Sequence, residues 1–292
     1  MNLIQNLSVA LAFSLLISFA LYYLFNKNNI LLDQVNSSKH KLLTTKYSDH
    51  KVTLCGGIII FLCSILFFDN QLLVLKILSA FIVFIGILSD IDKLNSPKIR
   101  IIYQFFIVLL LLLLNENLAI NDLRIDFFNN ILEIKSISIL FTIFCILILI
   151  NGTNFLDGVN TLVIGYYMIV LGIIIITSIQ FNLNINNNIF YFIIFLATVF
   201  IFNFFNKIYL GDSGSYLVSF FTAFFILDFV SQNYLVSPYF FCLLLWYPAF
   251  ENLFSILRKI KKNISVSKPD NYHLHHLIYK KINKQLVGGR VN

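Results

Sequence analysis

Three aspartates stand out in a chain that is otherwise rich in apolar residues. Asp90 lies in GILSDIDKLNSPKIR, Asp157 in NGTNFLDGVN and Asp212 in KIYLGDSGS, each at the end of an apolar stretch. Ionised carboxylates next to a bilayer are costly and are functional candidates by default. One such Asp alone is well explained as a solvated helix end, but three within Gly- or Asn-containing motifs favour a site. Carboxylates, amides, imidazoles and glycines that converge on one membrane face indicate a metal and phosphate site.

The segment NGTNFLDGVN places polar residues at intervals of three. Asn151, Asn154, Asp157 and Asn160 share a broad face if the segment is helical. Such a face offers amides that hydrogen-bond a nucleotide or sugar, and one carboxylate that binds a cation. The alternative is that Asn and Gly break the helix here and form a turn.

The segment YLGDSGS places Asp212 between two glycines. Gly211 and Gly214 permit a tight backbone and the close approach of a ligand. A carboxylate is a hard oxygen ligand, suited to a Mg²⁺ ion that is shared with substrate phosphates. The motif alone is weak evidence, but its place after an apolar stretch and near Lys207 strengthens it.

A histidine cluster follows the last apolar stretch. His273, His275 and His276 form HLHH, and clustered His residues also bind zinc. Neither a second His cluster nor a Cys pair completes a zinc site, because the four cysteines show no CxxC spacing. The nearby Asp270 and the basic residues at 258–262 suit an anionic, phosphorylated ligand better.

The elements that must position these residues are predicted to be membrane-spanning helices. The 292 residues are 59% hydrophobic and only 12% charged, and the mean hydropathy is +0.84. A soluble protein carries roughly twice that charged fraction. Because lengths above about 15 residues in lipid favour helices, we expect an all-α, polytopic helical bundle. The apolar runs number about nine, at 3–26, 54–69, 71–89, 99–115, 136–150, 161–181, 188–206, 215–231 and 234–256.

Basic residues fall almost entirely on one side of these runs. Eighteen of the 21 Lys and Arg residues lie on the side that carries the three motifs, whereas only Arg124 and Lys135 lie in loops on the other side. Cytoplasmic loops are the basic ones, so we expect the N-terminus outside and the C-terminal tail in the cytoplasm. The same asymmetry explains the net charge of +7 without a nucleic-acid partner.

Taken together, the motifs resemble those of the polyprenyl-phosphate N-acetylhexosamine-1-phosphate transferases. This family includes the phospho-N-acetylmuramoyl-pentapeptide transferase group and the enzymes that initiate O-antigen and teichoic acid assembly. Four elements match in order, from about residue 33 to 281. They are the Gly-Gly pair before the second span, GILSDIDKLNSPKIR with the following Gln104, NGTNFLDGVN, and FNFFNKIYLGDSGS followed by HLHH.

The resemblance implies a reaction and roles for residues. A UDP-N-acetyl sugar and undecaprenyl phosphate would give undecaprenyl-diphospho-sugar and UMP, the first step of a cell-envelope glycan, with Mg²⁺, or Mn²⁺ in its place, as cofactor. Asp212 and Asp157 would hold the metal, and Asp90 would accept a proton or orient the lipid phosphate. The substrate-binding residues would be Asn151, Asn154, Lys51, Arg258, His273, His275 and His276.

The resemblance also implies a location and an organisation. We expect one membrane domain over 1–292 in the bacterial inner membrane, with its active site facing the cytoplasm and a homodimer as an open alternative. The catalytic loops would lie at 27–53, 89–98, 151–160, 207–214 and 257–292.

The chain also departs from the pattern of the family. Ser89 stands where the family usually has the first Asp of a pair, and Asn160 where it often has Asp. Family members usually continue with one or two spans after the His motif, and no such spans follow it here. These departures leave a catalytically impaired relative as one alternative. A polytopic transporter of an anionic solute is a separate alternative from another class. Transporter carboxylates normally lie at the membrane midplane rather than at one face.

Overall fold

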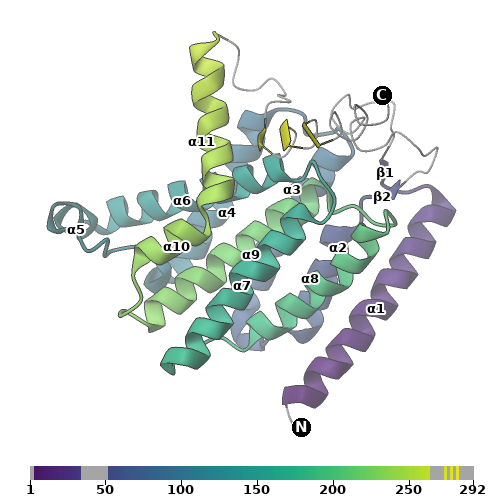
Figure 1. Cartoon of the computed structure of the whole chain (residues 1–292), viewed down its shortest axis with the longest axis horizontal. Coiled ribbons are helices and arrows are strands. Elements are labelled where there is room, and N and C mark those ends of the chain that lie inside the picture. The colour runs from purple at the N-terminus through teal and green to yellow at the C-terminus, as the bar shows by residue number, and fades with distance from the viewer. Residues whose placement is uncertain (1–2, 34–51, 264–272, 275–276, 279–280, 283–292) are drawn as a thin grey trace, which may run out of the picture.

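The computed structural model of the chain is a bundle of α-helices with two very short strands (Figure 1). It describes residues 3–33, 52–263, 273–274, 277–278 and 281–282. The helices are α1 (Leu3–Asn28), α2 (Gly56–Phe67), α3 (Leu73–Asp90), α4 (Pro97–Leu114), α5 (Asp126–Leu132), α6 (Lys135–Leu156), α7 (Leu162–Phe181), α8 (Asn188–Phe204), α9 (Gly211–Gln232), α10 (Pro238–Leu244) and α11 (Trp246–Lys261). Strands β1 (Leu32–Asp33) and β2 (Val52–Thr53) pair antiparallel.

The helices confirm the expected polytopic, all-α membrane fold. Six of those described are long and apolar enough to cross a membrane, namely α1, α3, α4, α6, α7 and α9. The shorter apolar helices α2 and α8 and the bent pair α10–α11 account for the other three apolar runs. The backbone amides of these segments are therefore satisfied within helices, as a bilayer requires.

The last apolar run is not one straight span. The sequence predicts a span over 234–256, but the structure divides it into α10 and α11, which meet at a bend of 69°. Pro248 lies in the first turn of α11 and has no N–H to continue a helix from α10. Beyond the bend, α11 changes direction (Figure 1) and packs against α6.

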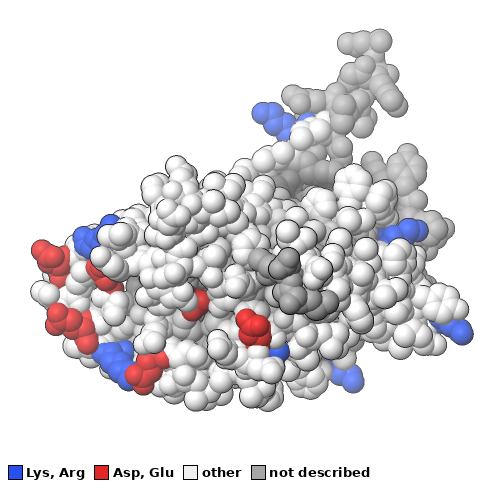
Figure 2. All heavy atoms as spheres, turned by 90° about the horizontal axis from the view of Figure 1, so that it is seen from below, with Lys and Arg blue, Asp and Glu red and all other residues white. Residues whose placement is uncertain are grey.

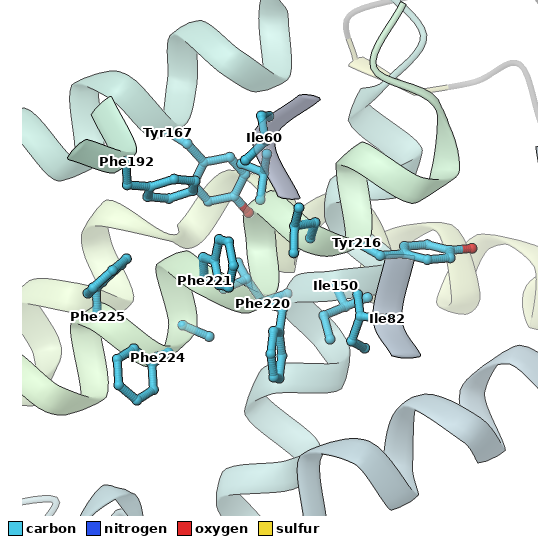
Figure 3. Packing of buried hydrophobic residues seen from close by; sticks show 14 of the residues in the cluster. Ile60, Ile82, Ile150, Tyr167, Phe192, Tyr216, Phe220, Phe221, Phe224 and Phe225 are labelled. Atoms are coloured by element: carbon cyan, nitrogen blue, oxygen red, sulfur yellow. The ribbon is translucent and has the colours of Figure 1, made fainter. Parts of the chain in front are cut away.

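Helix α9 forms the centre of the bundle. In the most apolar 18 residues of α9, 83% are buried, whereas in those of α1, at the edge of the bundle, 17% are buried. It contacts α2, α3, α6 and α7. Figure 3 shows its aromatic side chains packed with others from the surrounding helices, including Phe192 of α8, Tyr167 of α7 and Ile82 of α3. This packing fixes the place of the first turn of α9, which carries Asp212.

Two glycines let neighbouring helices reach that first turn. A Cβ on Gly86 of α3 would lie 2.2 Å from Ser213 Cα, and a Cβ on Gly57 of α2 would lie 2.4 Å from Gly214 N. Neither distance is possible for a real side chain. The Gly-Gly pair thus allows close packing, and Gly56 also begins α2.

The ends of several helices lie inside segments that the sequence assigns to loops. Helix α6 continues to Leu156, α9 begins at Gly211, and α11 continues to Lys261. The predicted loops 151–160, 207–214 and 257–292 are therefore shorter at these ends. Tertiary packing overrides the weak helix propensity of Asn, Gly and Ser in these motifs.

Charged side chains gather at one edge of the face in Figure 2, on the side where α5 lies in Figure 1, while most of that face is neutral. The segment between α4 and α6 supplies such charges, and Lys135 forms an ion pair of 2.6 Å with Glu116. The orientation of the bundle across the membrane stays a prediction from the charge asymmetry.

Candidate active site

Asp90 holds the start of α9. It is the last residue of α3, and its two carboxylate oxygens accept the backbone N–H groups of Asp212 at 2.8 Å and Ser213 at 3.2 Å. The first N–H groups of a helix have no partner in their own helix and carry partial positive charge, so a carboxylate placed there is stabilising. Asp90 thus acts as a cap that comes from another helix.

Gly211 makes this capping geometry possible. Its φ of +73° lies in the left-handed region, and an added Cβ would be 2.8 Å from Asp90 Oδ2. Only glycine adopts such a backbone without strain while leaving room for the carboxylate. The GDSG motif is therefore a tight helix start rather than a loop.

Asp212 belongs to a small polar cluster. The cluster lies on the side of the bundle that the sequence predicts to be cytoplasmic. Ser89 Oγ donates a hydrogen bond of 2.5 Å to Asp212 Oδ2, and Arg100 Nη1 lies 2.9 Å from the same oxygen. Arg100 Nη1 also lies 2.5 Å from Ser89 Oγ and 3.1 Å from the hydroxyl of Tyr216. The side chains of Arg100 and Asp212 keep 18% and 27% of their surface exposed, so a ligand can reach both charges.

The helix starts explain how Arg100 arrives there. Helix α4 begins at Pro97, a residue favoured in the first turn because its missing N–H would have no partner. Arg100 follows three residues later, and α4 packs against α3. Ser89 and Asp90, adjacent at the end of α3, therefore contact Arg100, Asp212 and the α9 backbone within one small volume.

Two amides of α6 extend this cluster. Asn154 Oδ1 accepts a hydrogen bond of 3.2 Å from Ser215 Oγ of α9, and Asn151 Nδ2 donates one of 3.0 Å to Gln104 Oε1 of α4. Gln104 is fully buried, and its Nε2 has no hydrogen-bond partner in the described part of the chain. Asn151 and Asn154 thus lie on the α6 face that contacts α4 and α9, as the three-residue spacing predicts.

The rest of the NGTNFLDGVN motif lies at the end of α6 and in the turn that follows it. Asp157 is the C-terminal cap of α6, and Asn160 lies beyond it in a turn where its Nδ2 donates to Asn206 Oδ1. Thr161 takes a left-handed φ of 64°, and its N–H donates to Asn203 Oδ1. Both expectations from the sequence are thus partly right, because the motif is helical up to Leu156 and a turn after it.

The described histidine, His273, lies against α11 rather than on the Asp212 cluster. His273 Nδ1 is 2.9 Å from Glu251 Oε2, and the His273 ring stacks on Phe155 with centroids 5.1 Å apart. His273 is 4% exposed and Glu251 is 2% exposed. Arg258, the substrate-binding candidate in α11, has its guanidinium 5.6 Å from the ring centre of Phe254.

Lys51, His275 and His276 lie outside the described residues. Sequence reasoning missed Arg100 and Glu251 as members of the site. The signal for Arg100 was its place one turn after the Pro that begins α4. Glu251 gave a signal too, as a lone carboxylate in an apolar run.

The carboxylates fit a cation that takes its remaining ligands from a substrate. Across the described ranges, no group of three or more His, Cys, Asp and Glu side chains could hold a metal ion. However, Mg²⁺ in phosphoryl-transfer sites is usually bound by one or two carboxylates together with substrate phosphates. Asp212 is partly exposed, and its Oδ1 accepts no hydrogen bond from the described residues, so it offers one such ligand.

A family comparison now bears on this site. The model of the family described as Glycosyl transferase family 4 matches residues 72–230, which is more than half of the chain. The chain belongs to glycosyl transferase family 4. In this family 4 transferase the matched region runs from α3 to α9 and contains Ser89, Asp90, Arg100, Asn154 and Asp212. A search of curated proteins found no match.

Proposed function

We propose that this family 4 transferase moves a phospho-N-acetyl sugar from a UDP-sugar to undecaprenyl phosphate. An oxygen of the lipid phosphate attacks the sugar-linked phosphorus, the bond to the uridine-linked phosphate breaks, and UMP leaves. Undecaprenyl-diphospho-sugar is the other product, and the reaction starts a cell-envelope glycan in the bacterial inner membrane.

The observation that carries this proposal is the Asp90–Asp212–Arg100 cluster at the start of α9. Both reactants are phosphates and repel each other, so the site must supply positive charge. The guanidinium of Arg100 supplies it directly, and a cation held by the Asp212 carboxylate would add to it.

Each remaining residue has a role that its contacts support. Asp90 holds the first turn of α9, and thereby Asp212, in place. The amides of Asn151 and Asn154 bind acceptor groups of the sugar nucleotide, and the buried Gln104 orients Asn151 through the hydrogen bond at its Oε1. A strong base is not required, because the second pKa of a phosphate is about 6 and the attacking oxygen is deprotonated at neutral pH.

Asp212, with Asp157 as its second carboxylate, would hold Mg²⁺, or Mn²⁺ in its place. When bound, this ion neutralises charge on the diphosphate. Arg258, Lys51 and the three histidines at 273, 275 and 276 remain proposed contacts of the sugar nucleotide from the cytoplasmic side.

The test is turnover by the purified protein in detergent or nanodiscs. A panel of radiolabelled UDP-N-acetyl sugars is supplied with undecaprenyl phosphate and Mg²⁺. We expect one sugar to yield a labelled lipid and an equal amount of UMP, and we expect chelation by EDTA to stop both. Intact protein that makes neither product with any sugar of the panel would contradict the proposal. Uptake of an anionic solute by vesicles that hold this inactive protein would support the transporter alternative.

A further inference from the structure

The break between α10 and α11 occurs at a carbonyl that its own helix cannot satisfy. The carbonyl of Leu244 would normally accept the N–H of the residue four positions on, which is Pro248. Proline has no N–H, and its ring clashes with that carbonyl. The two helices therefore bend by 69°, and the Leu244 oxygen needs a donor from elsewhere because water cannot serve it in a bilayer.

Tyr166 of α7 is that donor. Its hydroxyl donates a hydrogen bond to the carbonyl oxygen of Leu244. The ring of Tyr166 also meets the ring of Tyr247 edge-on, with centroids 6.2 Å apart. One side chain thus contacts the last residue of α10 and the second residue of α11.

Helix α6 holds the other side of the bend. A Cβ on Gly152 would lie 2.1 Å from the carbonyl oxygen of Pro248, so the two backbones are in direct contact. One turn further on, Asn252 Nδ2 donates 3.1 Å to the carbonyl of Ile148. The first two turns of α11 are therefore packed on the same part of α6 that carries Asn151 and Asn154.

The basic end of α11 depends on this angle. Lys259 is 5% exposed, and its Nζ lies 5.8 Å from the ring centre of Phe155, which sits between Asn154 and Asp157 in the α6 motif. A change in the bend would carry Arg258 and Lys259 away from that motif, since both lie more than two turns beyond the break.

We propose that Tyr166 is a positioning residue whose hydroxyl sets the bend between α10 and α11. Through the bend it holds the basic last turn of α11 beside the Asn154–Asp157 segment, where an anionic sugar nucleotide binds. The part that concerns substrate rests on the proposed function, whereas the part that concerns the bend does not.

The first test measures the bend itself in the full chain. Spin labels are attached at Ile169→Cys on α7 and Leu257→Cys on α11, both exposed, with Cys145 and Cys242 replaced by Ser. Tyr166→Phe removes only the hydroxyl, and we expect it to shift or broaden the distance distribution between the labels. An unchanged distribution would overturn the proposal.

Tyr167→Phe is the matched control. Tyr167 is the neighbouring residue on α7, is also buried, and its hydroxyl bonds Thr153 of α6 rather than the break. We expect its distance distribution to match that of the parent. If Tyr167→Phe shifts the label distance as much as Tyr166→Phe does, then the loss of any buried hydroxyl loosens the bundle. That result would overturn the specific role of the Tyr166 hydroxyl.

The second test separates binding from chemistry. Loss of the Tyr166 hydroxyl should raise the KM for the UDP-sugar by about tenfold and change kcat less than about twofold, because the reacting groups stay in place while a binding element moves. A fall in kcat with an unchanged KM would contradict a positioning role. If the labels respond as expected but the parent protein shows no turnover, the bend assignment stands and the proposed function fails.

A double variant keeps the proposal testable if Tyr166→Phe is unstable. Adding Pro248→Ala restores a backbone N–H at position 248. The Leu244 carbonyl can then accept this N–H within a continuous helix and no longer needs the Tyr166 hydroxyl. We expect the melting temperature to return to the parent value while the label distance stays shifted. A return of the parent distance with Phe at position 166 would show that the hydroxyl does not set the bend.

Discussion

At the scale of single residues, Ser89 connects the two charges of the site. Its hydroxyl donates to Asp212 and accepts from Arg100, at 2.5 Å in both cases. The resemblance places an aspartate at this position in related enzymes. A hydroxyl can perform both roles without a charge of its own, so Ser89 adds no negative charge beside the Asp212–Arg100 ion pair.

Replacing Ser89 tests this arrangement. We expect Ser89→Asp to keep turnover and to lower the Mg²⁺ concentration for half-maximal rate by about tenfold, because a second adjacent carboxylate binds the cation more strongly. Ser89→Ala should lower turnover by about tenfold, through loss of a hydrogen bond to a charged group. Mg²⁺ titrations of the rate measure both. An inactive Ser89→Asp protein beside a fully active Ser89→Ala protein would show that position 89 is not equivalent to the acidic position of the family.

At the scale of elements, the decisive feature is the junction between α3 and α9. The end of one helix caps the start of another, and glycines remove the side chains that would keep them apart. A substitution that disrupts these hydrogen bonds or this close packing should lower stability and activity together, since the same backbone turn positions Asp212.

Gly211→Ala tests the junction. The new Cβ would meet the Asp90 carboxylate at a left-handed φ, and we expect a loss of about 1–3 kcal/mol of stability together with most of the activity. Thermal unfolding in detergent measures the first and turnover the second. The control is Gly172→Ala in α7, where an added Cβ meets nothing within 4 Å, so the helix should gain up to about 1 kcal/mol. Equal melting temperatures for the two variants would contradict the role given to Gly211.

Most of the elements follow from the sequence, while the contacts between them do not. Apolar runs predict where helices lie because the bilayer accepts little else, and the three-residue spacing placed Asn151 and Asn154 correctly. The bend at Leu245 was missed because the apolar run continues through Pro248. Arg100 and Glu251 were missed as site residues because their partners, Asp212 and His273, are distant in sequence. Only the packing of α3, α4 and α9, and of α11 with Phe155, brings these groups together.

At the scale of the whole molecule, charge distribution should decide the orientation in the membrane. The basic side contains the Asp212 cluster and the end of α11, whereas α5 and its neighbouring loops lie at the other side. The positive-inside rule then places the site in the cytoplasm.

Cysteine labelling of intact cells tests this orientation. Single cysteines are introduced at Asp126 in α5 and at Lys262 after α11, and an impermeant maleimide is added from outside. We expect labelling at position 126 and none at position 262 until the membrane is permeabilised. Ready labelling of position 262 in intact cells would reverse the proposed topology.

The most direct measurement of the central claim compares two aspartates of the same helix. Asp212 and Asp228 lie at opposite ends of α9, about 24 Å apart at 1.5 Å per residue, and Asp228 accepts its hydrogen bonds from Asn186 and Gln232. Each is changed to Asn, and the transfer of labelled sugar phosphate to undecaprenyl phosphate is measured with protein that is monodisperse and equally stable. We expect Asp212→Asn to lose on the order of 100-fold or more in rate and Asp228→Asn to keep the parent rate. A near-parent rate for Asp212→Asn at limiting Mg²⁺ would contradict the account.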